Sequence, residues 1–298
     1  MDSKCGFVAI IGAPNAGKST LTNLLVGGKV TIVSPKVQTT RGSVRGIMVE
    51  GKTQLIFCDT PGIFKAEGKL EKAIVTHAME QISQDMDIVL LVDAAKQNKK
   101  AVAIILEQLR FLNKKVILAL NKIDLVSKGN LLPIMKYYEE TNLFSEIFLI
   151  SASNNDGIDD LKKVIIERAP ASPFLYPEDQ LTDVSSRFLA QEITREKLFI
   201  ALKDELPYNL SVETDSWKEA ENGKVTIDQT IYINKEGQKK IIIGSKGQMI
   251  KEVGTQARKE LEEIFATRIN LYLHVKVKPD WLDKPYMYTH MGLKYPKK

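Results

Sequence analysis

The first half of the chain alternates short apolar runs with longer amphipathic stretches. The runs are rich in Val, Ile and Leu without polar alternation, as is typical of strands buried on both faces. They lie at residues 7–11, 55–58, 88–92, 116–120 and 147–150, with candidate helices at 18–25, 70–84 and 100–112. Repeated strand–helix alternation predicts right-handed βαβ units, and therefore an α/β domain with a mostly parallel sheet and helices on both faces.

The pattern changes after a proline-rich segment that begins near residue 169. We expect a first domain over 1–168, an inter-domain linker over 169–182, a second domain over 183–280 and a basic, aromatic tail over 281–298. The elements predicted after the linker are a helix at 186–205, strands at 210–213 and 225–233, a strand-like run at 241–243, an amphipathic helix at 249–265 and a strand at 271–278. This order predicts an α+β second domain.

The amino-acid composition is typical of a soluble globular protein and argues against membrane-spanning, secreted and disulfide-rich classes. Hydrophobic residues make up 44% and charged residues 27%, as in ordinary globular proteins. The apolar runs are much shorter than the roughly 20 residues of a membrane-spanning helix, and no signal peptide is recognisable. Cys5 and Cys58 form neither a disulfide framework nor a zinc motif. We therefore expect a cytosolic protein with two reduced thiols.

The net charge of +5 is concentrated in one segment. Residues 235–278 hold ten basic and five acidic side chains, so the excess over this segment equals that of the whole chain. Contact with a polyanion is expected there.

A phosphate-binding motif lies between the first predicted strand and the first predicted helix. Glycines let backbone N–H groups surround an anion at a helix N-terminus. Lys18 would reach the β- and γ-phosphates, and Ser19 would ligate Mg²⁺. The candidate nucleotide-binding residues of this loop are Gly12, Ala13, Pro14, Asn15, Ala16, Gly17, Lys18, Ser19 and Thr20.

A second motif follows the strand at 55–58. Its residues are Asp59, Thr60, Pro61, Gly62 and Ile63. Because the Asp59 carboxylate emerges at the carboxyl end of a strand, it can hold Mg²⁺ through water, and the Gly62 N–H can sense a γ-phosphate.

Two further loops select the base. They are Asn121, Lys122, Ile123 and Asp124, and then Ser151, Ala152 and Ser153. The Asp124 carboxylate can accept the N1–H and exocyclic N–H of guanine, a donor pair that adenine lacks. The Lys122 stem would cover the ring, Asn121 would connect this loop to the phosphate loop, and the Ala152 N–H could meet guanine O6. Each loop ends a strand, where open α/β sheets bind ligands.

With these motifs in this order, the first half of the chain resembles the translation-factor-like class of P-loop GTPases. The string at 38–41, Gln-Thr-Thr-Arg, further resembles the first switch region of the Era family of bacterial ribosome-assembly GTPases. The resemblance implies that Thr40 ligates Mg²⁺ when GTP is bound, with Thr39 as the second choice. The predicted metal ligands are thus Ser19, Thr40 and Asp59.

One position predicts slow hydrolysis. Ile63 stands where Ras-type enzymes carry the glutamine that orients the attacking water. The resemblance adds the hypothesis that Asn15 helps to bind a K⁺ ion that acts at the transition state. The predicted catalytic residues are Lys18, Thr40, Gly62 and Asn15.

The second domain carries a GxxG loop before its amphipathic helix. The predicted RNA-binding residues are Ile243, Gly244, Ser245, Lys246, Gly247 and Lys251. A KH module clamps about four nucleotides of single-stranded RNA backbone on such a loop. The element order helix, strand, strand, helix, helix, strand resembles type II KH domains. Together with the GTPase motifs, it extends the resemblance to the Era family over nearly the whole chain.

That resemblance implies a function and its partners. The expected function is a GTP/GDP switch that binds the single-stranded 3′ end of small-subunit (16S) rRNA during assembly of the small ribosomal subunit. We expect a monomer, and RNA binding coupled to GTP through ordering of the switch regions.

Two alternatives stay open. The first is a membrane-associated signalling GTPase with weak peripheral contact at the inner face of the cell membrane, made by Trp281, Tyr286, Tyr288 and Tyr295. The second is an RNA-binding module in which the nucleotide serves only structure.

Overall fold

The computed structural model describes residues 2–36, 39–66, 68–80, 82, 85–111, 114 and 116–296. These residues form two compact units. The described parts of 1–31 and 40–183 make up unit 1, and those of 32–39 and 184–297 make up unit 2.

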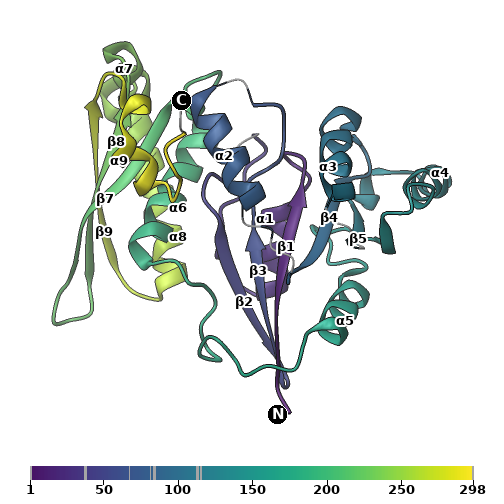
Figure 1. The fold of residues 1–298 in the computed structure, drawn as a ribbon. Coiled ribbons are helices and arrows are strands. Elements are labelled where there is room, and N and C mark those ends of the chain that lie inside the picture. Colours follow the sequence, from purple (N-terminus) through teal and green to yellow (C-terminus); the bar gives the residue numbers. More distant parts are fainter. Residues whose placement is uncertain are drawn as a thin grey trace. The chain divides into compact units, whose positions relative to one another are not determined.

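Unit 1 is built on a six-stranded sheet in the order β2-β3-β1-β4-β5-β6 (Figure 1). Its strands are β1 (Lys4–Gly12), β2 (Val44–Glu50), β3 (Thr53–Asp59), β4 (Asp87–Asp93), β5 (Val116–Asn121) and β6 (Phe144–Leu149). Its helices are α1 (Lys18–Val26), α2 (Lys69–Glu80), α3 (Lys99–Phe111), α4 (Lys128–Glu139) and α5 (Ile158–Arg168). All pairings are parallel except that of β2 with β3.

Both faces of this sheet are covered. Ile88, Leu90 and Val92 of β4 share one apolar cluster with residues of α2, α3 and α4. The intervening Val89 and Leu91 are equally buried. This two-sided burial explains the uninterrupted apolar runs and confirms the predicted α/β class.

The structure of unit 1 differs from the sequence-based prediction in three respects. Strand β2 was not predicted, because its Val-Arg-Gly-Ile-Met-Val-Glu sequence lacks a continuous apolar run, as suits an edge strand. The run at 147–150 belongs to a strand that starts at Phe144 and ends before Ile150. Helices α4 and α5 were not named, and α4 contains Pro133. The predicted helix ends at Gln84 and Leu112 lie outside the described residues.

Unit 2 holds a three-stranded sheet in the order β7-β8-β9 (Figure 1). Strands β7 and β8 are antiparallel, and β8 and β9 are parallel. The elements are α6 (Ser186–Ala201), β7 (Leu210–Glu219), β8 (Val225–Ile233), α7 (Glu236–Ile243), α8 (Gln248–Phe265), β9 (Ile269–Val277) and α9 (Pro285–His290). Helices α6 and α8 pack on the sheet through a cluster that includes Ile193, Ile227 and Leu261.

Three predictions for unit 2 were inexact. The run at 241–243 is the last turn of helix α7, because only Ile242 is buried and a helix buries one face. Helix α6 ends at Ala201, since the following residue is extended. The first strand continues to Glu219 as an antiparallel partner of β8, although its outer half is polar.

The segment at 169–182 is attached to unit 1 by hydrogen bonds. The Leu175 N–H donates to Gln54 Oε1 at 2.8 Å, and the Ile47 N–H donates to the Leu181 carbonyl at 2.8 Å. The tail after β9 packs into unit 2, where Trp281 and Tyr288 are fully buried. Within the described part of the chain, no helix is both long and apolar enough to cross a membrane.

Candidate functional site

The phosphate loop connects β1 directly to α1. Gly17 has φ 101°, and a Cβ atom there would lie 2.3 Å from Asn121 Nδ2, so only glycine fits. Lys18 begins the helix, and its Nζ donates to the carbonyls of Gly12 (3.2 Å) and Ala13 (3.0 Å). Burial lowers the pKa of Lys18 to about 8, although nearby Asp59 opposes the shift. The loop therefore presents one buried cation at a helix N-terminus.

Four oxygen-bearing side chains converge beside this lysine, three of them predicted from the sequence. Ser19 Oγ lies 3.0 Å from Thr40 Oγ1 and donates to Asp59 Oδ2 at 2.8 Å. Thr31, which the sequence analysis missed, also donates to Asp59 Oδ2, at 2.9 Å. Asp59 is fully buried, and among the described residues none is hydrogen-bonded to its Oδ1. Hydroxyl and carboxylate oxygens are what Mg²⁺ prefers, so this set fits that ion.

Burial has a second consequence at this cluster. It raises the pKa of the Asp59 carboxyl, against the opposing effects of Lys18 and the surrounding hydroxyl groups. A buried carboxylate without a full set of partners is costly, and a divalent cation would compensate it.

The two candidate threonines differ in their contacts. Thr40 Oγ1 faces Ser19, as above, whereas Thr39 Oγ1 lies 2.7 Å from Ser34 Oγ and donates to the Lys36 carbonyl at 2.8 Å. Of the two hydroxyl groups, that of Thr40 therefore belongs to the oxygen cluster. Gln38, the first residue of the predicted switch string, lies outside the described residues.

The segment after Asp59 lies against the phosphate loop. Thr60 Oγ1 donates to the Ile10 carbonyl at 2.9 Å, and the Ile63 N–H donates to the Gly12 carbonyl at 3.1 Å. The Ile63 side chain is 1% exposed and packs in the apolar cluster of the sheet. It is therefore a core residue as well as a residue that cannot orient water.

Hydrogen bonds join the base-selecting loops to the phosphate loop. Asn121 Nδ2 donates to the Ala16 carbonyl at 2.8 Å, and Ser151 Oγ donates to Asp124 Oδ1 at 2.6 Å. The Ala152 N–H donates to Asn121 Oδ1 at 3.0 Å. A contact of this N–H with guanine O6 would therefore compete with Asn121. Segments separated by more than a hundred residues thus form one site.

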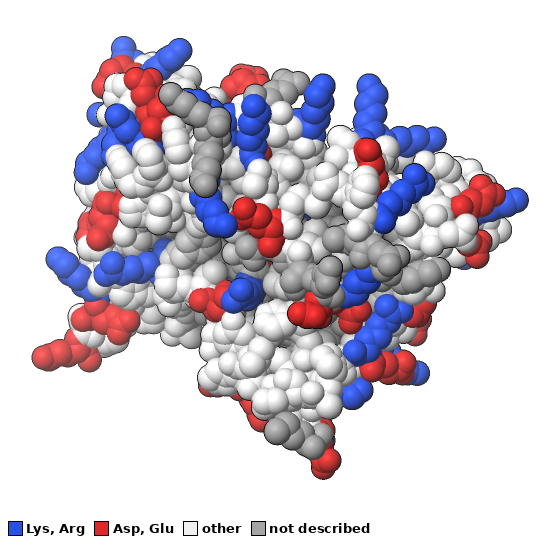
Figure 2. Space-filling view, viewed as in Figure 1, with Lys and Arg blue, Asp and Glu red and all other residues white. Residues whose placement is uncertain are grey.

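The GxxG loop lies between α7 and α8. Gly244 has φ 72°, and a Cβ atom there would lie 2.7 Å from Met249 Cβ, so the loop requires glycine at this point. Ser245 and Lys246 are exposed, and Lys246 has φ 49°. Lysine and arginine side chains crowd the end of unit 2 that carries α7, with some acidic ones among them (Figure 2).

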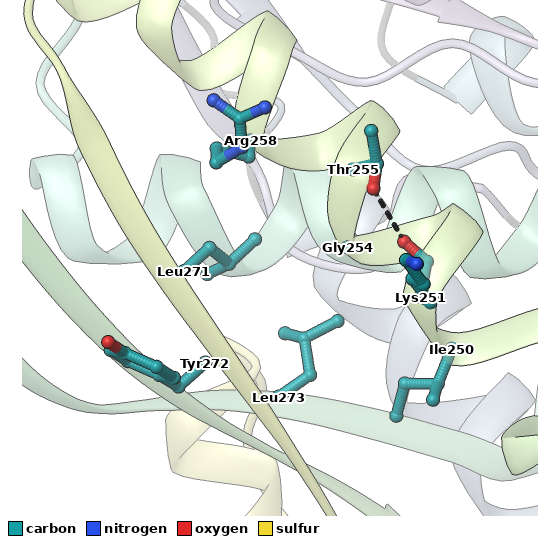
Figure 3. Close-up of a pocket in the computed structure, with 8 residues that line it drawn as sticks. All are labelled: Ile250, Lys251, Gly254, Thr255, Arg258, Leu271, Tyr272 and Leu273. Carbon is teal, nitrogen blue, oxygen red and sulfur yellow. Dashed lines mark hydrogen bonds between the residues drawn. The ribbon is translucent and has the colours of Figure 1, made fainter. Parts of the chain in front are cut away.

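A groove of about 330 Å³ runs between α8 and β9 (Figure 3). Lys251, predicted from the sequence, lines it, and its carbonyl accepts a hydrogen bond from Thr255 Oγ1 at 2.8 Å. The lining residues that the sequence analysis missed are Ile250, Gly254, Thr255, Arg258, Leu271, Tyr272 and Leu273. The sequence did contain a sign of this groove. Residues 251, 255 and 258 are spaced so that they share one face of the helix, and the strand that follows alternates apolar and polar residues.

The residues that line this groove include the charged Arg258 and the aromatic Tyr272. Arg258 Nη1 pairs with Glu262 Oε2 at 2.7 Å. The Ile269 N–H, and then Arg258, hold the pKa of Glu262 below its usual value. Tyr272 is 53% exposed. Tyr272 projects from the opposite side of β9 to Leu271 and Leu273 (Figure 3). Its exposed ring suits stacking of nucleic-acid bases, and the Arg258 cation suits contact with a charged backbone.

Known protein families match both the nucleotide-binding unit and the unit with the GxxG loop. Residues 7–122 match the family described as 50S ribosome-binding GTPase, and residues 205–282 match the KH domain family. The chain is 47% identical over 296 residues to GTPase Era of Bradyrhizobium sp. strain ORS 278, covering 99% of this chain and 96% of that protein. The chain belongs to the Era family of GTPases. It is therefore a GTPase with a C-terminal KH domain.

Other Era proteins give the same result. The Brucella suis protein is 47% identical over 99% of this chain and 94% of its own length. Era in complex with MgGDPNP and nucleotides 1506–1542 of 16S ribosomal RNA superposes with a TM-score of 0.91 at 38% identity, covering 97% of this chain and 99% of that one. A point variant of Aquifex aeolicus Era bound to GDP·AlF4⁻ gives 0.90 at the same identity and coverage.

Proposed function

We propose that this Era-family GTPase is a Mg²⁺-dependent switch whose KH domain binds the single-stranded 3′ end of 16S rRNA during assembly of the small ribosomal subunit in the cytoplasm. The observation that carries the proposal is that a complete set of guanine-nucleotide loops precedes a GxxG loop with an open groove beside it. The related Era bound to MgGDPNP and to 16S rRNA nucleotides 1506–1542 supports it.

In this proposal, Ser19, Thr40 and Asp59 hold the Mg²⁺ ion, which would neutralise charge on the β- and γ-phosphates. Lys18 binds the same phosphates with its ammonium group. The Gly62 N–H donates to the γ-phosphate, and Asp124 accepts from guanine N1–H and its amino group. The support is the convergence of the first three side chains within hydrogen-bond distance.

We infer that hydrolysis without a partner is slow, because the Ile63 side chain is buried in the core. A K⁺ ion bound with the help of Asn15 is part of the proposal, since it would supply the missing positive charge at the transition state. The test is GTP turnover of wild-type and Asn15→Ala protein in K⁺ and in Na⁺. Turnover that depends neither on the cation nor on Asn15 would refute this role.

The RNA function is tested by titrating a fluorescent single-stranded RNA that matches the 16S 3′ end into the protein. The titration is made with GDP and with a non-hydrolysable GTP analogue. We expect tighter binding with the analogue, and weaker binding for Gly247→Asp, which puts a carboxylate at the loop that meets RNA phosphates. Equal affinity in both nucleotide states would refute the coupling, and absence of binding would refute the RNA function.

The groove offers a sharper test through Tyr272. Tyr272→Ala should weaken RNA binding about tenfold, because stacking on one base contributes roughly 1–3 kcal/mol. Tyr272→Phe keeps the ring and is the matched control, with an expected affinity close to wild type. Equal losses in both variants would mean that the hydroxyl, not the ring, is what RNA contacts.

The membrane alternative has one specific observation in its favour, the half-exposed Tyr286. Against it, Trp281 and Tyr288 are buried within unit 2. Binding of the full chain to anionic vesicles, lost in Tyr286→Ala, would favour peripheral membrane contact. The proposal also includes the domain limits 1–168 and 183–280. It further includes a monomeric state, which sedimentation of the GDP-bound protein tests.

A further inference from the structure

A buried carboxylate outside all of the predicted nucleotide motifs touches the base-selecting loop. Asp93 is the last residue of β4, and it lies beside Asn121, the last residue of β5, in the parallel register of the sheet. Its Oδ2 accepts a hydrogen bond of 2.6 Å from Lys122 Nζ. The Asp93 side chain is 10% exposed and that of Lys122 is 28% exposed, so this is a largely buried ion pair.

The other carboxylate oxygen of Asp93 is also engaged. Oδ1 accepts from the backbone N–H groups of Ala95 and Lys96, each at 3.0 Å. These two bonds fix the turn after β4 and the orientation of the carboxylate. Asp93 therefore contacts Lys122 from a rigid support and not from a mobile loop.

Lys122 is held at both ends of its side chain. Its backbone adopts φ 65°, ψ 38°, and its Nζ donates to the Asn15 carbonyl at 2.7 Å as well as to Asp93. The four methylene groups between these points have little freedom left. Lysine normally loses much rotamer entropy when it is immobilised, and a stem ordered in advance avoids that loss on binding.

We propose that Asp93 is a positioning residue for the guanine base: it holds the Lys122 stem where the base binds, and thereby sets how long a guanine nucleotide stays bound. Lys122 belongs to the base-selecting loop, whereas the proposed Mg²⁺ ligands Ser19, Thr40 and Asp59 belong to other segments. The effect should therefore be the same for GDP and GTP, and it should leave the hydrolysis step untouched.

The test measures dissociation of fluorescent GDP and of a fluorescent, non-hydrolysable GTP analogue from the full chain. Asp93→Asn keeps an oxygen for the turn but removes the charge, and Lys122→Met keeps the stem but removes both hydrogen bonds. Each should release both nucleotides about tenfold faster, because each loses the charge-assisted hydrogen bond between Lys122 and Asp93; Lys122→Met, which also loses the bond to the Asn15 carbonyl, should be the faster of the two. Asp87→Asn, at the opposite end of the same strand, is the matched control with wild-type rates.

The double variant separates positioning from a general structural effect. Because both residues act through one contact, Asp93→Asn with Lys122→Met should release nucleotide no faster than the faster single variant. Single-turnover hydrolysis of bound GTP should keep its wild-type rate in Asp93→Asn. If Asp93→Asn does not fold, Asp93→Ser replaces it in the single and double variants, because serine retains a hydroxyl acceptor for the turn.

Three results would overturn the proposal. They are wild-type dissociation rates in the Asp93 variant, multiplication of the two single effects in the double variant, and a change confined to only one of GDP and the GTP analogue. The last result would place the effect at the phosphates.

Discussion

The phosphate loop and the GxxG loop of this chain both combine glycines with a lysine but are built differently. In the phosphate loop, Lys18 is 6% exposed and donates to two backbone carbonyls. In the GxxG loop, Lys246 is exposed. The phosphate loop is also joined to Asn121 and Lys122, which lie about a hundred residues away in sequence. The GxxG loop continues directly into α8 and is shaped mainly by Gly244.

Because the two loops are built differently, substitutions in them should affect ligand binding to different extents. A buried cation needs partners from several segments, so its site is cooperative and single substitutions are severe. An exposed loop interacts with its ligand through screened charges that act nearly independently, so single substitutions are mild.

The largest expected effect is in the phosphate loop. Lys18→Ala should weaken GTP and GDP binding by about 100-fold or more, because it removes the charge-assisted hydrogen bonds to the phosphates. Isothermal titration measures it. RNA affinity of the nucleotide-free protein should not change, and Lys163→Ala, an exposed lysine of α5, should bind nucleotide like wild type. If Lys18→Ala lost only a small part of its nucleotide affinity, the proposed difference between the phosphate loop and the GxxG loop would be wrong.

The next effect concerns stability. Ile63→Gln introduces an amide into an apolar cluster, so the free energy of unfolding should fall by about 2 kcal/mol, with no gain in GTP turnover. Denaturant unfolding and phosphate release measure these quantities. Ile63→Val, expected to cost about 1 kcal/mol, is the control. Faster turnover at unchanged stability would show that residue 63 faces the nucleotide and not the core.

A smaller effect is expected at the GxxG loop. Replacing Lys246 and Lys251 with alanine should weaken RNA binding about tenfold at moderate salt. It should also reduce the slope of log K against log salt by about 1.4, since two phosphate contacts to a single strand are lost. The pair Lys203→Ala and Lys218→Ala removes the same charge from unit 2 outside the groove. Equal effects of the two pairs would indicate general electrostatic attraction and no defined site.

The smallest effect is the pH dependence of nucleotide binding. Phosphates bind the ammonium form of Lys18, whose pKa burial lowers to about 8. The charged fraction falls from about nine-tenths at pH 7 to about a quarter at pH 8.5, so GDP affinity should fall about fourfold as pH rises over this range. Lys18→Arg, which does not titrate there, corrects for titration of the nucleotide. The same slope in both proteins would contradict the lowered pKa.

Much of the site could be predicted because it follows local rules. Each nucleotide motif directly follows a buried strand, and the carboxyl ends of parallel strands meet at one edge of the sheet. The order of the motifs along the chain therefore predicted that Asp59, Asn121 and Ser151 would lie near the phosphate loop. Glycine positions and the periodicity of α8 likewise express local backbone geometry and one-sided burial.

Tertiary structure alone decided the remaining features. The burial of Ile63 and the contact between Asp93 and Lys122 depend on which side chains meet across the fold. The groove lined by Arg258 of α8 and Leu271 of β9 depends on how a strand packs beside a helix. Periodicity records that a residue is buried or faces outward, but not which distant residue it contacts. The sequence alone thus determined the fold class and the chemistry of the loops, and packing determined the partners of individual side chains.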